Sequence, residues 1–232
     1  MYQLALILCI ISTQALADES KKINYHALNQ ALFSFVYKEN GWGCEESRSG
    51  TGSTLKETST LRAELPKLLR RINAHIMIDA ACGDFNWMKT VDLSMLHLYI
   101  GLDIVPEMIA QNIERYGANN RLFFTVDIAS FPLPRADVVM CRDCIQHLPD
   151  ENIFAIIRNI KKSKSTYLLM SNQEDIEENR NMTGKLVYQP LRLSFRNLFL
   201  KPFSFPKPMF AIDEGLNDKK LCLWRVEDLP DF

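Results

Sequence analysis

The sequence predicts an α/β domain built around a mostly parallel sheet. Five short apolar runs are typical of strands buried on both faces of a sheet, at 76–78, 98–102, 122–126, 136–141 and 166–170. Helical patterns separate several of these runs, and strands that alternate with helices form parallel sheets with right-handed crossovers. The last quarter differs, because strand-like runs at 209–212 and 221–226 are close enough to pair antiparallel across a turn at 213–219.

The chain is organised around residues 76–88, which read IMIDAACGDFNWM. An apolar strand ends at Asp79 and leads into a turn built on Gly83, after which we expect a helix carrying Trp87 and Met88. In open α/β sheets, ligands bind outside the carboxyl ends of the strands. This turn is therefore the expected front edge of a nucleotide-like site.

Two helices and a loop are expected before the central strand. Apolar residues at helical spacing over 23–37 predict a helix that packs on the body of the domain. The Gly- and Ser-rich stretch 41–53 has the composition of a loop. Ser53 is the expected N-cap of the next helix, in which Pro66 is expected to cause a kink or to start a new helix.

Two further helices are expected between later strands. Pro106 stands near the first turn of a helix over 106–116, where its missing N–H costs nothing. Asp150 is the expected cap of a helix whose isoleucines recur at helical spacing toward the core.

Composition indicates an ordinary folded domain and excludes some partners. The 232 residues include 27 basic and 28 acidic side chains, so nothing marks a nucleic-acid or acidic-lipid binder. Cys141 and Cys144 form a C-x-x-C, but no second such pair or His pair completes a metal site. We expect no metal, and we interpret both cysteines as small apolar residues at a strand end.

The N-terminus has the layout of a secretory leader. Residues 4–11 are an unbroken apolar run, and Ala15-Leu16-Ala17 is a small-x-small cleavage pattern, although no Lys or Arg precedes them. We therefore expect a signal peptide or membrane leader at 1–17, with the protein exported or anchored to a membrane through it. An odd number of cysteines after cleavage favours the alternative, a cytoplasmic protein with a buried N-terminal helix.

Polar residues follow four of the predicted strands. Asp79, Asp103, the pair Asp127-Ile128 and the pair Arg142-Asp143 each stand at a carboxyl end. Asp103 follows Asp79 at about the spacing of the acid that binds ribose hydroxyls in nucleotide-binding folds. A single Asp there often only caps a helix or closes a turn. Several Asp residues, each at the carboxyl end of a strand, favour a binding site at one edge of the sheet.

These stretches resemble the motifs of class I S-adenosylmethionine-dependent methyltransferases. IDAACGD is similar to their first motif, YIGLDIVPEMI to the second, FFTVDI to the third and ADVVMCRDCIQHLP to the fourth. The likeness spans about residues 60–230, and CGDFNW with the upstream WGCEESRSGTGS resembles a narrower, poorly characterised subgroup. It implies a single Rossmann-like domain with a seven-stranded, mostly parallel sheet, a C-terminal antiparallel hairpin and helices on both faces.

The resemblance implies S-adenosyl-L-methionine as cofactor and assigns residues to it. Asp79 and the Gly83 turn would hold the methionine portion, Asp103 the ribose, and Asp127 with Ile128 the adenine. The remaining expected contacts are Ala81, Trp87, Ile104 and Arg142.

Methyl transfer from a sulfonium is an in-line displacement that depends mainly on positioning and exclusion of water. A general base is needed only for a protonated acceptor, and Asp143 and His147 are the candidates. Four residues apart, they would share a helix face if this stretch were helical. The alternative is that Asp143 caps the next helix and His147 packs at its start.

The glycine-rich loop has two interpretations. From the residues alone it is a connector. With the resemblance added, it would fold over the cofactor, with small residues allowing close backbone approach. The residues in question are Glu46, Ser47, Ser49, Gly50 and Ser53, with Arg62 as a further partner for the methionine carboxylate. The expected organisation is thus a leader at 1–17, N-terminal helices and covering loop at 18–75, and the core at 76–232.

Two other functions compete with methyl transfer to an unidentified small-molecule or protein acceptor. A nicotinamide-dependent oxidoreductase is disfavoured, because glycines of its fingerprint would stand where Ala81 and Phe85 are. A non-catalytic exported binding protein on the same fold is favoured only by the leader, since export separates a protein from most supplies of the cofactor.

Overall fold

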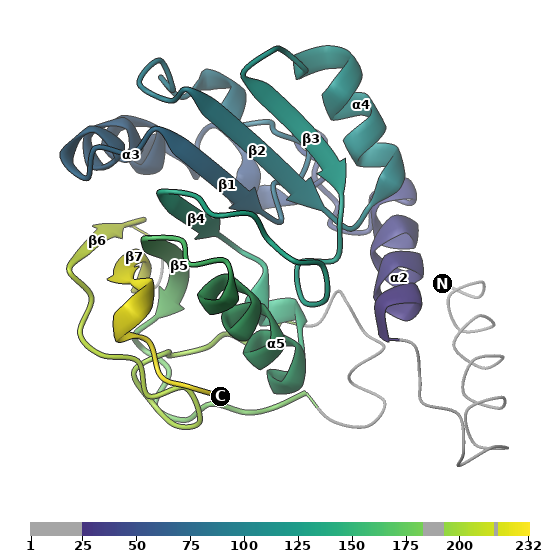
Figure 1. Cartoon of the computed structure of the whole chain (residues 1–232). Coiled ribbons are helices and arrows are strands. Elements are labelled where there is room, and N and C mark those ends of the chain that lie inside the picture. The colour runs from purple at the N-terminus through teal and green to yellow at the C-terminus, as the bar shows by residue number, and fades with distance from the viewer. Residues whose placement is uncertain (1–24, 183–192, 216–217) are drawn as a thin grey trace, which may run out of the picture.

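The computed structural model describes residues 25–182, 193–215 and 218–232. They form a seven-stranded sheet in the order β3-β2-β1-β4-β5-β7-β6 (Figure 1). The parallel strands are β1 (Ile76–Ala80), β2 (Leu98–Asp103), β3 (Arg121–Thr125), β4 (Val138–Cys141) and β5 (Tyr167–Gln173). β6 (Phe210–Asp213) pairs antiparallel with β7 (Lys219–Arg225), which also pairs antiparallel with β5. The predicted fold class and terminal hairpin are confirmed.

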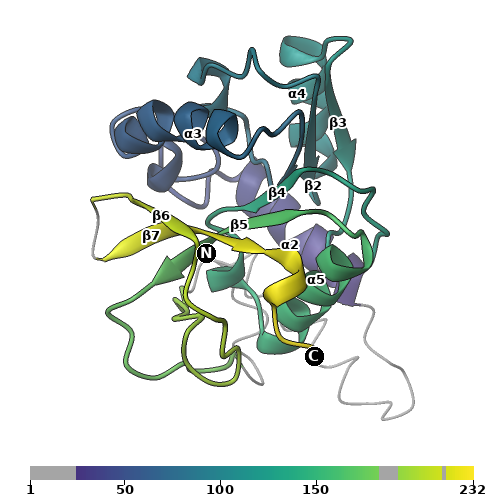
Figure 2. The same ribbon diagram turned by 60° about the vertical axis from the view of Figure 1, so that its left-hand side comes forward.

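In the described residues, four α-helices surround this sheet. They are α2 (Tyr25–Lys38), α3 (Ser59–Arg71), α4 (Pro106–Tyr116) and α5 (Asp150–Lys162). Isoleucines of α5 belong to one hydrophobic core, and side chains of α3 and α4 belong to a second core, so helices cover both faces of the sheet (Figures 1 and 2). Short 3₁₀ turns lie at Thr51–Ser53, Met88–Thr90, Ile145–His147 and Val226–Asp228.

The connection from β1 to β2 contains no α-helix, so the helix expected around Trp87 is wrong. Only the 3₁₀ turn Met88–Thr90 forms there. Four successive side chains, those of residues 85–88, are buried. A helix with one buried face cannot bury four neighbours in a row, so this segment packs onto the sheet as turns.

Two expectations about helix starts are also corrected. Ser53 ends a 3₁₀ turn and caps nothing, because α3 begins only after Thr58. Pro66 lies inside α3 and does not start a new helix, while the kink expected there stays a prediction. Asp150 is the first residue of α5, after Pro149, and its carboxylate accepts from Arg196 Nε at 3.2 Å instead of capping the helix.

The topology places a crevice between β1 and β4. From β1 the chain moves outward to β2 and β3, and then crosses to the other side of β1 to form β4. Such a reversal leaves a space at the carboxyl ends of the two strands that is a preferred ligand position. Helix α2 runs past this edge, beside the tip of β3 (Figure 1).

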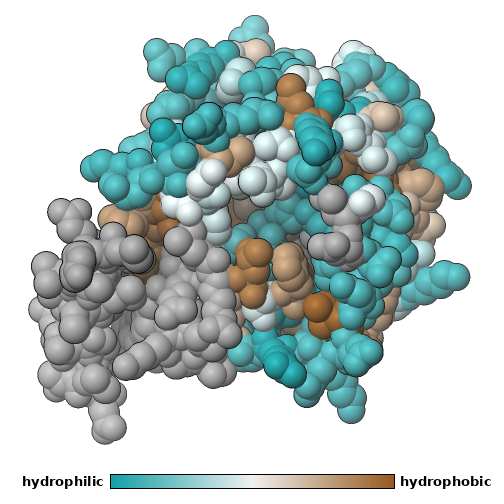
Figure 3. All heavy atoms as spheres, turned by 180° about the vertical axis from the view of Figure 1, so that it is seen from behind, coloured by the Kyte–Doolittle hydropathy of each residue, from teal (hydrophilic) through white to brown (hydrophobic). Residues whose placement is uncertain are grey.

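The surface seen from behind the view of Figure 1 is mainly hydrophilic, with small separate hydrophobic patches where it is described (Figure 3). Within the described ranges, no helix combines the length and apolarity needed to cross a membrane. The predicted leader at 1–17 lies outside the described residues.

Candidate functional site

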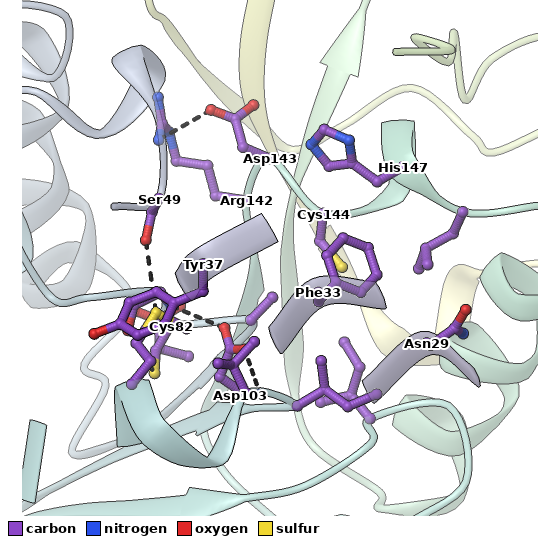
Figure 4. Close-up of a pocket in the computed structure, with 18 of the residues that line it drawn as sticks. Asn29, Phe33, Tyr37, Ser49, Cys82, Asp103, Arg142, Asp143, Cys144 and His147 are labelled. Carbon is purple, nitrogen blue, oxygen red and sulfur yellow. Dashed lines mark hydrogen bonds and ion pairs between the residues drawn. The ribbon is translucent and has the colours of Figure 1, made fainter. Parts of the chain in front are cut away.

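A cavity of about 150 Å³ opens at the carboxyl ends of the parallel strands. We call it the main cavity. It is lined by all the residues predicted from the core motifs to contact the cofactor or to act as a base: Asp79, Ala81, Gly83, Trp87, Asp103, Ile104, Asp127, Ile128, Arg142, Asp143 and His147. Figure 4 shows Asp103, Arg142, Asp143 and His147 around it, together with side chains of α2 and of the glycine-rich loop.

The turn after β1 uses the left-handed conformation at every second residue. Ala81, Gly83 and Phe85 have φ values of 72°, 61° and 59°. Only glycine adopts this region without steric cost. Ala81 and Phe85, which stand where a dinucleotide fingerprint has glycines, are therefore strained. Gly83 is further required by a close approach, because a Cβ there would lie 2.4 Å from Ser49 Oγ.

Asp79 lies beneath the main cavity and is 3 % exposed. Its Oδ2 accepts a hydrogen bond of 2.6 Å from the Tyr99 hydroxyl. Burial raises the pKa of Asp79 to about 7, although the Tyr99 hydrogen bond acts in the opposite direction. This carboxyl therefore changes charge near neutral pH.

Asp103 ends β2 and faces the turn after β1. Its two oxygens accept hydrogen bonds from the backbone N–H groups of Gly83 at 3.1 Å and Val105 at 3.2 Å. Burial raises the pKa of Asp103 to about 6, against the effect of these hydrogen bonds. The carboxylate is thus held in one orientation at the rim of the main cavity.

Asp127 ties the N-terminal helix to the end of β3. Its Oδ2 lies 3.1 Å from His26 Nδ1, on α2, and its Oδ1 accepts from the backbone N–H of Ala129 at 2.9 Å. Beside it, Gln30 Nε2 donates to the carbonyl of Ile104 at 3.2 Å. A ligand that contacts Asp127 would share an oxygen already used by one of these groups.

The carboxylate of Asp84 accepts three hydrogen bonds that fasten the glycine-rich loop to the turn. The hydroxyl of Ser47 donates to it at 2.9 Å, the backbone N–H of Arg48 at 2.7 Å and the hydroxyl of Ser49 at 3.2 Å. Glu46, in the same loop, accepts from Asn86 Nδ2 at 2.8 Å. The loop therefore packs on the turn through several side-chain hydrogen bonds. A simple connector would not require these bonds.

Only part of this loop reaches the main cavity. Ser49 and Ser53 line it, whereas Glu46, Ser47 and Gly50 hold the loop in place behind them. Arg62 donates to the carbonyl of Leu55 at 2.9 Å and is not among the lining residues, so its expected role toward a ligand carboxylate has no support in this arrangement.

Arg142 is the centre of a buried cluster of charges. Its Nη2 donates to Glu214 Oε2 at 2.6 Å and to the carbonyl of Gly52 at 2.9 Å, and its guanidinium carbon lies 5.5 Å from the centroid of the Trp87 ring. Arg142 Nη1 also pairs with Asp143 at 3.1 Å. Arg142 thus connects the glycine-rich loop to the β6–β7 hairpin.

Asp143 lies between two cations. Besides Arg142, Lys219 Nζ pairs with its carboxylate at 2.6 Å. Burial acts to raise the pKa of Asp143, but these two cations outweigh it and hold the pKa below its usual value. Asp143 has φ 51° and lies outside the 3₁₀ turn Ile145–His147, so the shared helix face expected for Asp143 and His147 is wrong. Asp143 is consequently a weak base.

His147 sits in an aromatic wall that the sequence did not reveal. Its ring lies 4.6 Å from the centroid of Trp42 and 6.3 Å from that of Phe33. Phe33 belongs to α2, which also supplies Asn29 and Tyr37 to the lining. The amphipathic pattern of 23–37 predicted the helix, but nothing in the pattern indicated that one face of it would close the main cavity.

The thiols and possible metal ligands add no further site. All five described cysteines are free, and Cys141 and Cys144 are not joined. Among the residues that the structure describes, no group of His, Cys, Asp or Glu is arranged to hold a metal ion.

Comparison with known protein families gives a match for part of the chain. Residues 77–163 match a family described as a methyltransferase domain. No curated protein sequence matches the chain.

Two solved structures share the fold over most of the chain. The N-methyltransferase NodS from Bradyrhizobium japonicum WM9 is 11% identical, with a TM-score of 0.53 over 73% of this chain and 96% of NodS. Human N-acetylserotonin methyltransferase, solved in complex with SAM, is 15% identical, with a TM-score of 0.51 over 84% of this chain and 58% of the human chain. At such identities these likenesses establish the fold alone. The chain therefore has the fold of these methyltransferases, and its segment 77–163 is similar to a methyltransferase-domain family.

Proposed function

We propose that this protein transfers the methyl group of S-adenosyl-L-methionine to an acceptor. The main support is that carboxylates at the ends of neighbouring strands line the same cavity. Asp103 and Asp127 stand at the ends of neighbouring parallel strands, and the turn on Gly83 lies between Asp103 and the glycine-rich loop. A carboxylate can accept hydrogen bonds from two vicinal hydroxyls, which suits a ribose.

The residues of the chain would supply binding, orientation and exclusion of water. Asp103 would accept from the ribose hydroxyls, and Asp127 with Ile128 would border the adenine. Asp79, in its ionised form beneath the turn, would favour the cationic end of the ligand. The cofactor itself supplies an activated methyl group on sulfur, so this chain needs mainly to align the acceptor and keep water out.

Calorimetry with S-adenosylhomocysteine tests the proposal on the purified chain. We expect binding in the micromolar range or tighter, and no heat at high micromolar ligand would refute it. Asp103→Ala should weaken binding by about 1–3 kcal/mol, because a hydrogen-bonded charged partner is lost. Asp92→Ala is the matched control, since Asp92 is an exposed carboxylate that pairs with Arg70 outside the main cavity.

The same samples separate the competing enzyme class. A nicotinamide-dependent oxidoreductase would enhance NADH fluorescence on binding, whereas the proposed methyltransferase would leave it unchanged. A binding protein without catalysis would bind S-adenosylhomocysteine but form none from S-adenosylmethionine with any acceptor.

A further inference from the structure

The turn after β1 lacks the feature that usually holds an anion in nucleotide-binding α/β folds. In those folds, the anionic group of the ligand lies at the N-terminus of the helix that follows the first strand, where free N–H groups and the helix dipole favour negative charge. In the connection from β1 to β2, which the structure describes throughout, only the 3₁₀ turn Met88–Thr90 forms. A ligand carboxylate at this edge would therefore meet no helix N-terminus.

The backbone N–H groups of the turn are also occupied. Those of the four successive residues 81–84 all donate within the protein. Two of them donate to the carbonyl of Leu102 at 2.8 and 2.9 Å, one to Asp103 Oδ2 at 3.1 Å and one to Ser49 Oγ at 2.8 Å. A ligand carboxylate beside these residues would find their donors already paired, so its partner has to come from another segment.

Arg48, in the glycine-rich loop, is an unpaired cation of the main cavity. The only other arginine among the described lining residues is Arg142, and no lysine lines the cavity there. Arg142 is 6 % exposed and pairs with Glu214 at 2.6 Å and with Asp143 at 3.1 Å. Within the described part of the chain, the guanidinium of Arg48 makes no ion pair and no hydrogen bond. Arg48 can therefore pair with a ligand anion without breaking an existing contact.

The backbone of Arg48 is fixed beside the turn. Its N–H donates to Asp84 Oδ2 at 2.7 Å, and the hydroxyls of its neighbours Ser47 and Ser49 donate to the same carboxylate at 2.9 and 3.2 Å. Burial raises the pKa of Tyr37, which lines the cavity from α2, and the charge of Arg48 acts to lower it. The guanidinium thus lies near Tyr37, at the end of the main cavity formed by the turn and the loop.

We propose that Arg48 binds the carboxylate of the methionine portion of S-adenosylmethionine, in place of the missing helix N-terminus. This inference rests on the proposed methyl transfer. The planar guanidinium can donate two parallel hydrogen bonds to a carboxylate. Arg62, which the sequence offered for this contact, donates to the carbonyl of Leu55 and does not line the cavity. Because Arg48 belongs to the glycine-rich loop, the contact makes cofactor binding depend on that loop.

Calorimetry with two ligands tests the inference on the full chain. The ligands are S-adenosylhomocysteine and its decarboxylated analogue, which keeps the amine but carries hydrogen in place of the carboxylate. The test variant is Arg48→Ala, and Arg48→Lys keeps the charge but loses the planar fork. Arg158→Ala is the matched control, because Arg158 is an exposed arginine of α5 that does not line the main cavity.

We expect Arg48→Ala to bind S-adenosylhomocysteine about tenfold more weakly than the wild type, with Arg48→Lys between the two. The decarboxylated analogue should bind Arg48→Ala as tightly as it binds the wild type, which also shows that the rest of the site is intact. The control variant should bind both ligands as the wild type does.

Two results would overturn the inference alone. Unchanged affinity of Arg48→Ala for S-adenosylhomocysteine would mean that another group binds the carboxylate. An equal loss of affinity for both ligands would mean that Arg48 supports the site as a whole and does not recognise the carboxylate. If the wild type bound neither ligand, the proposed function would fail and the inference with it, so wild-type binding of S-adenosylhomocysteine separates the two failures.

Discussion

Replacing Asp84 by Ala should release the glycine-rich loop from the turn after β1. Three loop groups donate to this carboxylate, from Ser47, Arg48 and Ser49. Hydrogen bonds to charged groups contribute about 1.5–3 kcal/mol each when buried. Asp84 is only partly buried and water replaces some of the lost bonds, so we take about 1 kcal/mol for each. The docked loop should then lose about 3 kcal/mol, which increases its open population about a hundredfold.

Amide hydrogen exchange measures this opening directly. The informative amides are those of Gly50 and Ser53, which donate to the carbonyls of Ser47 and Gly50 at 3.1 and 3.0 Å and do not contact Asp84 themselves. In Asp84→Ala we expect both to exchange about a hundredfold faster, with the affinity for S-adenosylhomocysteine reduced if the loop covers the ligand. Asp92→Ala should leave both rates unchanged. Unchanged rates in Asp84→Ala would show that Asp84 does not hold the loop.

Three further predictions concern stability and processing. Gly83→Ala should destabilise the fold by about 1–3 kcal/mol in urea unfolding, because the new Cβ would meet Ser49 Oγ at a left-handed φ; full stability would contradict the described approach. The raised pKa values of Asp79, about 7, and Asp103, about 6, mean that the folded state binds more protons than the unfolded state above the unfolded pKa of about 3.9. The stability of the ligand-free protein should therefore fall as pH rises from about 4 to 7, with Asp79 contributing on the order of 4 kcal/mol. Asp79→Asn, which can still accept from Tyr99, should flatten that dependence, and a wild-type slope in this variant would contradict the assignment. Finally, we propose export or membrane attachment through residues 1–17, and mass spectrometry of protein from its own cells should find a mature N-terminus at Asp18 if the leader is cleaved; an intact Met1 on a soluble cytosolic protein would contradict this proposal.

Much of the fold could be predicted because its strands carry a strong signal. Buried parallel strands require continuous apolar runs, and each such run was found within a few residues of its observed position. The helix expected after Gly83 failed because the burial of residues 85–88 arises from packing against α3 and the sheet, which local spacing does not reveal.

The candidate site was predictable to the extent that topology creates it. Carboxyl ends of parallel strands meet at one edge, so Asp79, Asp103 and Asp127 had to come close together. The partners of Asp84 and Arg142 could not be inferred. These contacts join residues 35 to 90 positions apart, and isolated Ser, Gly and Glu residues in loops carry no periodic pattern.

The hydrogen bonds of Arg142 to two distant segments also limit how this protein can be truncated. Its partners Gly52 and Glu214 both lie outside residues 77–163, the segment that matches the methyltransferase family. A fragment cut to that segment would keep the pair of Arg142 with Asp143 but lose the Gly52 carbonyl and the Glu214 carboxylate. Removing the final hairpin would likewise loosen the loop near Gly52, although the two are far apart in the chain. Fragments made for dissection or grafting experiments should therefore keep both Gly52 and Glu214 with Arg142.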